Sequence, residues 1–188
     1  MLDSPVCLSI AGSDSSGRAG IQADLQTFAA FDVYGTSAIT AVTAQDRTGV
    51  ASIHPVPTVD VRQQIQSVLS SFDVGAIKTG MLHDASIVRV VAQCVADAKK
   101  PLVIDPLVKA SSGDALLSED ALGVAKKELF PLAAAITPNL PEAEALLNRT
   151  LLNERDICLA AAELSEQFGC AIVIKGGHGD DKSTDIAV

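Results

Sequence analysis

The sequence predicts an α/β fold, a doubly wound, mainly parallel sheet with helices on both faces. In residues 8–28 a short apolar run breaks into a turn of Gly, Ser and Asp, and apolar residues then recur with helical spacing. Hydrophobic residues make up 48% of the 188 residues but aromatic ones only 3%, so small aliphatic side chains must build the core, as in buried parallel strands. Strand and helix patterns alternate to the end of the chain, which indicates crossovers within one domain, residues 1–188.

After the opening unit, the predicted elements follow one another with short turns between them. Strands are expected where apolar runs are bounded by turn residues, and helices where apolar residues recur every three or four positions. Thr58 and Asp84 are expected to cap two of the helices. The predicted strands span residues 36–45, 50–56, 75–79, 102–104 and 134–137, with one from 171 into a glycine turn and a return strand from 184; the predicted helices span 58–69, 84–95, 118–129 and 156–168, with one opening at 138–142.

Charge and cysteine content exclude several classes of function. The formal net charge is −9, which argues against nucleic acid or an anionic membrane surface as a partner. The four cysteines are widely spaced, show no metal-ligand spacing, and are expected to be buried thiols in a reducing compartment. No apolar run approaches the length of a membrane span, and the N-terminus has no signal-peptide pattern. We therefore expect a cytoplasmic protein.

Glycine, polar and charged residues follow the predicted strands. In an open α/β sheet the carboxyl ends of the parallel strands share one edge, where such folds bind their ligands. A binding site is therefore expected at that edge. The residues at the predicted strand ends are Gly12, Gln45, Gly80, Met81, Asp105, Asn139 and Lys175.

Three of these positions suggest phosphate and metal chemistry, each with an alternative. The ammonium of Lys175 and the two glycines after it suit a phosphoryl group, or Lys175 is a solvated lysine before a hairpin. Asp105 and Glu142 could hold Mg²⁺, which takes only one or two protein carboxylates. Asn139 and Glu142 are three residues apart at a helix start, so they could instead form a capping box.

Two other positions suit an aromatic heterocycle. Gln45 offers an amide donor and an acceptor, the pair needed to read a ring edge. Met81 could supply an apolar wall, although a core methionine is the commoner use of this residue. His178, on a polar turn, is expected to be solvated rather than catalytic.

Together the motifs resemble the hydroxymethylpyrimidine and hydroxymethylpyrimidine-phosphate kinases of thiamine biosynthesis, in the ribokinase-like superfamily. The resemblance extends over the whole chain, and the motifs occur in the family's order. They are Ala11-Gly-Ser-Asp-Ser-Ser-Gly17, Ala19-Gly-Ile-Gln-Ala-Asp-Leu25, Thr40-Ala-Val-Thr-Ala-Gln45, Lys78-Thr-Gly-Met-Leu82, Ser112-Gly-Asp114, Thr137-Pro-Asn-Leu-Pro-Glu142 and Lys175-Gly-Gly-His178.

The resemblance implies ATP- and Mg²⁺-dependent phosphorylation of 4-amino-5-hydroxymethyl-2-methylpyrimidine, its monophosphate, or both. A vitamin B6 kinase of the same superfamily and a non-catalytic pyrimidine-binding module are the alternatives. A small aminopyrimidine is the expected partner, and a homodimer is one expected assembly. By the same resemblance, Gln45, Gly12, Asp24 and Met81 bind the pyrimidine, Lys175 and Asn139 bind nucleotide phosphates, and Asp105 and Glu142 belong to the metal region.

The chain also departs from the family pattern. Arg18 stands where the family usually has glycine, and Asp46 and Arg47 replace a more usual Asn-Thr pair. The family continues into a Gly-Thr-Gly segment that supplies an anion hole and, just after it, the catalytic base, but nothing after Lys175 matches this segment. The catalytic base is therefore not assigned. We expect that a chain ending at Val188 is a truncated form of a longer kinase and lacks phosphotransfer by itself.

Overall fold

The computed structural model describes residues 4–107, 118–176 and 184–188. Its centre is an eight-stranded sheet in the order β3-β2-β1-β4-β5-β6-β7-β8. All neighbouring pairs are parallel except β2 with β3 and β7 with β8, so the prediction of a mainly parallel sheet is confirmed. The strands are β1 (Val6–Asp14), β2 (Tyr34–Gln45), β3 (Val50–Pro55), β4 (Val74–Thr79), β5 (Leu102–Ile104), β6 (Ala135–Ile136), β7 (Ala171–Ile174) and β8 (Ile186–Ala187).

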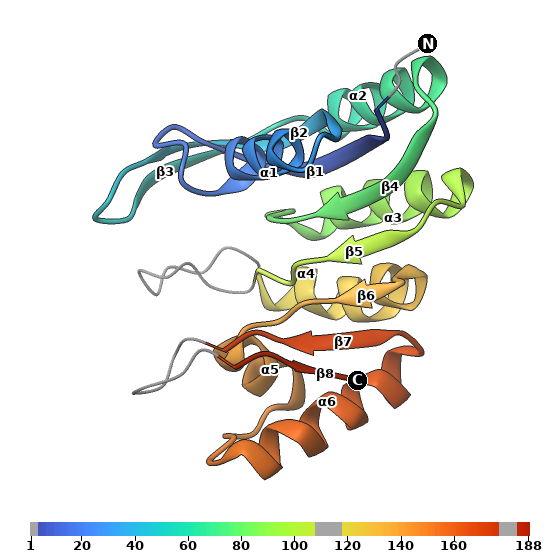
Figure 1. Ribbon diagram of the computed structural model, residues 1–188. Helices are drawn as coiled ribbons and strands as arrows, with labels where there is room; N and C mark the ends of the chain where they lie inside the picture. The colour runs from blue at the N-terminus through green and yellow to red at the C-terminus, as the bar shows by residue number, and fades with distance from the viewer. Residues whose placement is uncertain (1–3, 108–117, 177–183) are drawn as a thin grey trace.

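Helices lie on both faces of this sheet (Figure 1). Because parallel crossovers are right-handed, α1, which leads from β1 to β2, lies on one face, and the helices of the crossovers that run in the opposite direction lie on the other. Successive strands are thus added on one side of β1 up to β3 and on its other side from β4 onward, which makes the carboxyl ends of β1 and β4 the switch point of the sheet. The helices are α1 (Gly20–Ala30), α2 (Thr58–Ser71), α3 (Ala85–Ala98), α4 (Glu119–Val124), α5 (Leu140–Leu147) and α6 (Glu154–Phe168).

The main core fills the space between the sheet and the helices opposite α1. It is built from fully buried aliphatic side chains of neighbouring strands, together with an aromatic pair in which Phe130 meets Phe168 edge to face at 5.1 Å. The largest fully buried members on the strands are Leu8, Ile10, Ile77, Leu102, Ile104, Ile136 and Ile172. This agrees with the prediction of a core made of small aliphatic residues.

The predicted helices are present with ends shifted by up to three residues, and one predicted cap is wrong. Asp84 caps α3, because its side chain accepts from the backbone N–H groups of Ser86 and Ile87. Thr58 does not cap α2; it is the first helical residue, and Pro57 holds the N-cap position with no side-chain hydrogen bond. The predicted helix 118–129 begins as α4 and continues as a π-helical turn over Ala125–Leu129.

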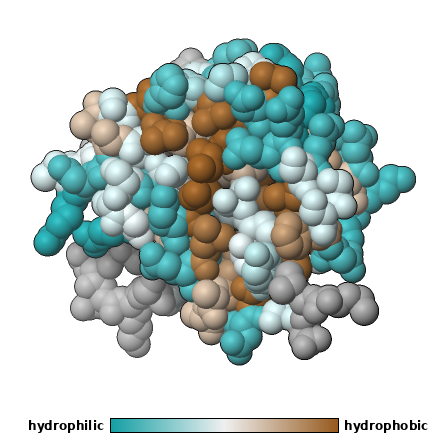
Figure 2. Space-filling view, turned by 90° about the horizontal axis from the view of Figure 1, so that it is seen from above, coloured by the Kyte–Doolittle hydropathy of each residue, from teal (hydrophilic) through white to brown (hydrophobic). Residues whose placement is uncertain are grey.

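Helices cover the two faces of the sheet to different extents. Of the helices that the structure describes, α1 alone lies on its face, over β1 and β2. On that side β4, β5, β6 and β7 present Ala76, Val103, Ala135 and Val173, which are all partly exposed. Figure 2 shows the molecule from above, with a hydrophobic band that crosses this view between hydrophilic residues. The exposed large hydrophobic side chains of the described residues are Phe31, Tyr34, Val42, Val59, Leu132, Leu152, Leu159 and Val188.

Two buried threonines allow the core to be tested. Among the described residues, Thr79 Oγ1 is buried and has no hydrogen-bond partner, whereas Thr40 Oγ1, also buried, donates to the Met81 carbonyl at 2.6 Å. Thr79→Val should leave the free energy of unfolding unchanged or raise it by about 1 kcal/mol, while Thr40→Val should lower it by about 1–3 kcal/mol. Urea denaturation of both variants compares them directly. An equal loss in the two would mean that the Thr79 hydroxyl has a partner, such as a buried water.

Candidate active site

The carboxyl ends of β1 and β4 meet at the switch point and form an apolar wall. Gly12, near the end of β1, lies against the tip of Met81, which follows β4. A Cβ atom at Gly12 would lie 2.5 Å from Met81 Cε, so the glycine permits this close approach. Met81 packs in a small cluster that is separate from the main core and contains Ala41, Val50, Ile53 and Leu107.

Gln45, the last residue of β2, lies beside this wall and is held by its backbone. Its N–H donates to Ser15 Oγ, and the same hydroxyl donates to the Gln45 carbonyl, both at 2.8 Å. The side-chain Oε1 accepts a 3.3 Å hydrogen bond from Thr43 Oγ1. Val50 is the cross-strand neighbour of Gln45, so a half-buried amide stands at the rim of an apolar surface.

The glycine-rich turn between β1 and α1 is organised by Asp14, a residue that was not predicted from the sequence to belong to the site. Its buried carboxylate accepts from the N–H groups of Ser16, Arg18 and Ala19 and from Ser16 Oγ, at 2.8–3.0 Å. Burial favours the neutral acid, but these hydrogen bonds outweigh it and hold the pKa of Asp14 below its ordinary value of 3.8. The amides of the turn that leads into α1 are thus occupied by a protein carboxylate. The sequence does carry a signal for this role, because an Asp two residues before a Ser-Gly pair is typical of a turn in which the Asp side chain accepts from the following backbone N–H groups.

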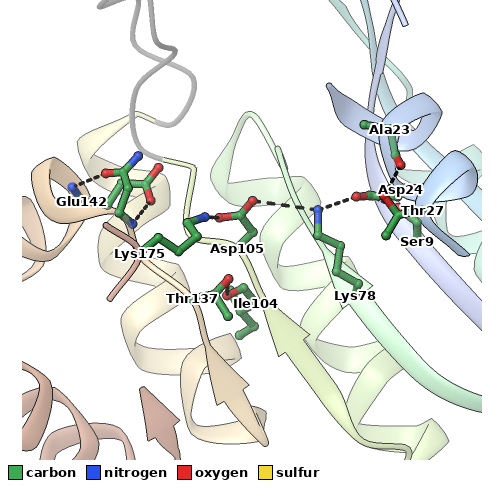
Figure 3. Close-up of polar contacts among 11 residues, drawn as sticks. Ser9, Ala23, Asp24, Thr27, Lys78, Ile104, Asp105, Thr137, Glu142 and Lys175 are labelled. Carbon is green, nitrogen blue, oxygen red and sulfur yellow. Dashed lines mark hydrogen bonds and ion pairs between the residues drawn. The ribbon is translucent and has the colours of Figure 1, made fainter. Parts of the chain in front are cut away.

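Next to the apolar wall, charged side chains of alternating sign cross the edge of the sheet. Each charged residue comes two positions after a partly exposed residue of the same sheet face: Lys78 after Ala76, Asp105 after Val103, and Lys175 after Val173. Lys175 Nζ donates to Asp105 Oδ1 at 2.7 Å, and Lys78 Nζ lies 3.9 Å from Asp105 Oδ2 (Figure 3).

Lys78 is also paired with Asp24, on α1. Its ammonium donates to Asp24 Oδ1 at 2.9 Å, and Ser9 Oγ donates to Asp24 Oδ2 at 2.6 Å. Lys78 and Ser9 were not selected from the sequence as site residues, because their partners are far away in the chain. The prediction that Asp24 contacts the pyrimidine stays a prediction.

Asn139 and Glu142 form the capping box that the sequence allowed. Asn139 Oδ1 accepts from the Glu142 N–H at 2.9 Å, and Glu142 Oε2 accepts from the Asn139 N–H at 2.8 Å. Glu142 is only 2% exposed. Asn139 forms a parallel bridge with Lys175, so α5 begins beside the lysine. The capping role does not exclude a second role toward a ligand.

The carboxylates at this edge of the sheet suit a Mg²⁺ ion whose other ligands would be phosphate oxygens and water. Within the described residues, no three His, Cys, Asp or Glu side chains come together as a metal cluster. Mg²⁺ is commonly bound through one or two carboxylates together with phosphate oxygens and water. The Asp105 side chain, 18% exposed, offers one such carboxylate, whose Oδ2 is only loosely paired. Lys175 holds the other oxygen.

The structure therefore brings the predicted residues together in two neighbouring halves. Gly12, Gln45 and Met81 form one half, and Asp105 and Lys175, with Asn139 beside them, form the other. His178 and the Ser112–Asp114 motif lie outside the described residues.

Comparison with known proteins supports a kinase. The family profile described as phosphomethylpyrimidine kinase matches residues 14–188. A hydroxymethylpyrimidine/phosphomethylpyrimidine kinase of Haemophilus influenzae is 46% identical over 182 residues, which cover 95% of this chain and 67% of that protein. The chain thus spans about two thirds of the length of this relative.

Solved structures show the same fold. A phosphomethylpyrimidine kinase of Clostridium difficile is 38% identical with a TM-score of 0.90, and the match covers 98% of this chain and 80% of that one. A pyridoxal kinase of Staphylococcus aureus in complex with AMP-PCP and pyridoxal is 34% identical with a TM-score of 0.85, covering 98% and 68%.

The role of Asp14 leads to a prediction about stability. Asp14→Asn removes a charged acceptor from several N–H and O–H donors and should lower the free energy of unfolding by about 2 kcal/mol at pH 7. Because the pKa of Asp14 is lowered in the folded state, its contribution is present above the unfolded pKa and is lost as the pH falls through the folded pKa. The gap between wild type and variant should thus be constant down to about pH 4 and shrink below it.

Chemical denaturation at a series of pH values measures this gap. Asp46→Asn is the matched control, since Asp46 makes similar contacts to Thr48 on an exposed turn and should contribute little. An Asp14→Asn variant as stable as wild type at pH 7 would contradict the assignment.

Proposed function

This chain belongs to the phosphomethylpyrimidine kinase family, and from that membership we propose that it transfers a phosphoryl group from ATP to a hydroxymethyl aminopyrimidine or its monophosphate. The observation that carries the proposal is the junction of the two halves of the site. An apolar wall with an amide at its rim adjoins a row of carboxylates and ammonium groups. Phosphoryl transfer needs such an arrangement, because catalysis depends mainly on positioning and on charge stabilisation.

In this proposal the Gln45 amide forms hydrogen bonds with the polar edge of the pyrimidine ring, and Met81 and its neighbours contact the ring face. Gly12 leaves room for the Met81 side chain. Lys175 contacts the nucleotide phosphates, and Asn139 stands next to it. Asp105 would hold Mg²⁺, with Glu142 belonging to the same region. When bound, the metal would neutralise phosphate charge.

The Lys175 ammonium is paired with Asp105 but has further N–H groups to donate to a phosphate. Its ammonium is 2.7 Å from Asp105 Oδ1, and its side chain is 37% exposed. When Asp105 binds Mg²⁺, we propose that Lys175 turns from the carboxylate toward the ligand phosphate, which exchanges one charged partner for another.

None of the helices in the described part of the chain is long and apolar enough to cross a membrane. The expectation of a homodimer stays a prediction.

Gln45→Ala tests the pyrimidine half. The variant should weaken binding of the hydroxymethyl aminopyrimidine by about 1–3 kcal/mol, because polar ring atoms then lose their partner, while ATP–Mg²⁺ affinity should hardly change. Isothermal titration of wild type and variant with both ligands measures the two effects. Titration with pyridoxal on the same samples distinguishes the vitamin B6 kinase alternative. Equal pyrimidine affinity in variant and wild type would show that the pocket lies elsewhere.

Glu142→Gln separates metal binding from helix capping. A glutamine Oε1 can still accept from the Asn139 N–H, so the capping box and the melting temperature should be nearly unchanged. Loss of the carboxylate should weaken nucleotide binding only where Mg²⁺ is present. ATP titrations at several Mg²⁺ concentrations provide the measurement. An unchanged Mg²⁺ dependence would leave capping as the whole role of Glu142.

A further inference from the structure

Asp24 has both carboxylate oxygens engaged by the protein. Oδ2 accepts from Ser9 Oγ at 2.6 Å and Oδ1 accepts from Lys78 Nζ at 2.9 Å, while the side chain is only 14% exposed. Ser9 lies on β1 and is buried, so it anchors the carboxylate to the centre of the sheet. Asp24 thus faces Lys78 rather than open space.

Lys78 lies where the two halves of the site meet. A Cβ atom at Gly80, directly before the Met81 wall, would lie 3.5 Å from Lys78 Nζ, so the ammonium is close to the pyrimidine half. On its other side, Nζ is 3.9 Å from Asp105 Oδ2 in the phosphate half. Figure 3 shows the resulting row, in which Asp24, Lys78, Asp105 and Lys175 follow one another with alternating charge.

The row has a consequence for nucleotide binding. In the described structure Asp105 is shared by two ammonium groups, at 2.7 Å from Lys175 and 3.9 Å from Lys78. When Lys175 turns to a phosphate, Lys78 is the cation that stays beside Asp105. It can stay only if it is fixed, and the Asp24–Ser9 contact is what fixes it, since a free lysine side chain has several rotatable bonds.

We infer that Lys78 is a positioning residue and that Asp24 acts on the site through it. Ser9 orients Asp24, Asp24 holds the Lys78 ammonium, and Lys78 keeps the Asp105 carboxylate directed toward the metal and phosphates once Lys175 has left it. In this inference Asp24 needs no direct contact with the pyrimidine. This inference rests on the proposed function, because it assigns the row to the nucleotide half of that site.

A double-mutant cycle tests the inference. Asp24→Asn, Lys78→Gln and the double variant are compared with wild type for ATP–Mg²⁺ affinity, for the Mg²⁺ concentration that supports half-maximal ATP binding, and for aminopyrimidine affinity. Each single change should weaken ATP–Mg²⁺ binding about tenfold and raise the required Mg²⁺ concentration, and the double variant should be no weaker than the single ones. Pyrimidine affinity should stay within about twofold of wild type in all three.

Two controls accompany the cycle. Lys100→Gln removes a lysine from a surface ion pair with Asp73 and should change neither affinity. Lys78→Arg keeps the charge and should restore most of the ATP–Mg²⁺ affinity lost in Lys78→Gln, which a loss of packing alone would not predict.

Three outcomes would overturn the inference. Weakened pyrimidine binding by Asp24→Asn, equal in the presence and absence of Lys78, would place Asp24 on the ring. A lower melting temperature with unchanged ATP–Mg²⁺ affinity would make the ion pair structural only. Additive losses in the double variant would show that the two residues act separately. Wild-type protein that binds neither ligand would instead overturn the proposed function itself.

Discussion

The sharing of Asp105 between Lys78 and Lys175 is the interaction on which the candidate site depends. A carboxylate that is only 18% exposed is stabilised by hydrogen-bond donors or by a cation, and here two cations reach it, Lys78 from β4 and Lys175 from the end of β7. One of them, Lys78, is itself fixed by Asp24, whereas the other, Lys175, is more exposed. The pairing thus combines a fixed cation with one that can be exchanged for a ligand.

The fold accounts for the place of this row. The sheet order reverses between β1 and β4, so that their carboxyl ends diverge into crossovers on opposite faces. Gly12 and Met81 meet at that point, and the same-face side chains of β4, β5 and β7 lead to Lys78, Asp105 and Lys175. A ring bound at the wall and a phosphate bound at the row would therefore be neighbours, as transfer between them requires.

The parts of this site that could be predicted from the sequence are the ones encoded locally. Gln45, Asp105 and Lys175 each follow an apolar run, and Asn139 and Glu142 have capping-box spacing, so their places could be predicted without a structure. The Asp24–Lys78 pair could not, because the two residues are 54 positions apart and meet only when α1 packs on the sheet beside β4. The predicted Thr58 cap was wrong for a local reason, since Pro57 holds the N-cap position and Thr58 is the first residue of α2.

A crystal structure with a non-hydrolysable ATP analogue, Mg²⁺ and the hydroxymethyl aminopyrimidine would test the central claim most directly. The account predicts the ring between Gln45 and Met81, the phosphates on Lys175, and the metal on Asp105, with Lys78 still bound to Asp24. A ring or a nucleotide bound elsewhere, with the Lys175–Asp105 pair intact, would contradict it.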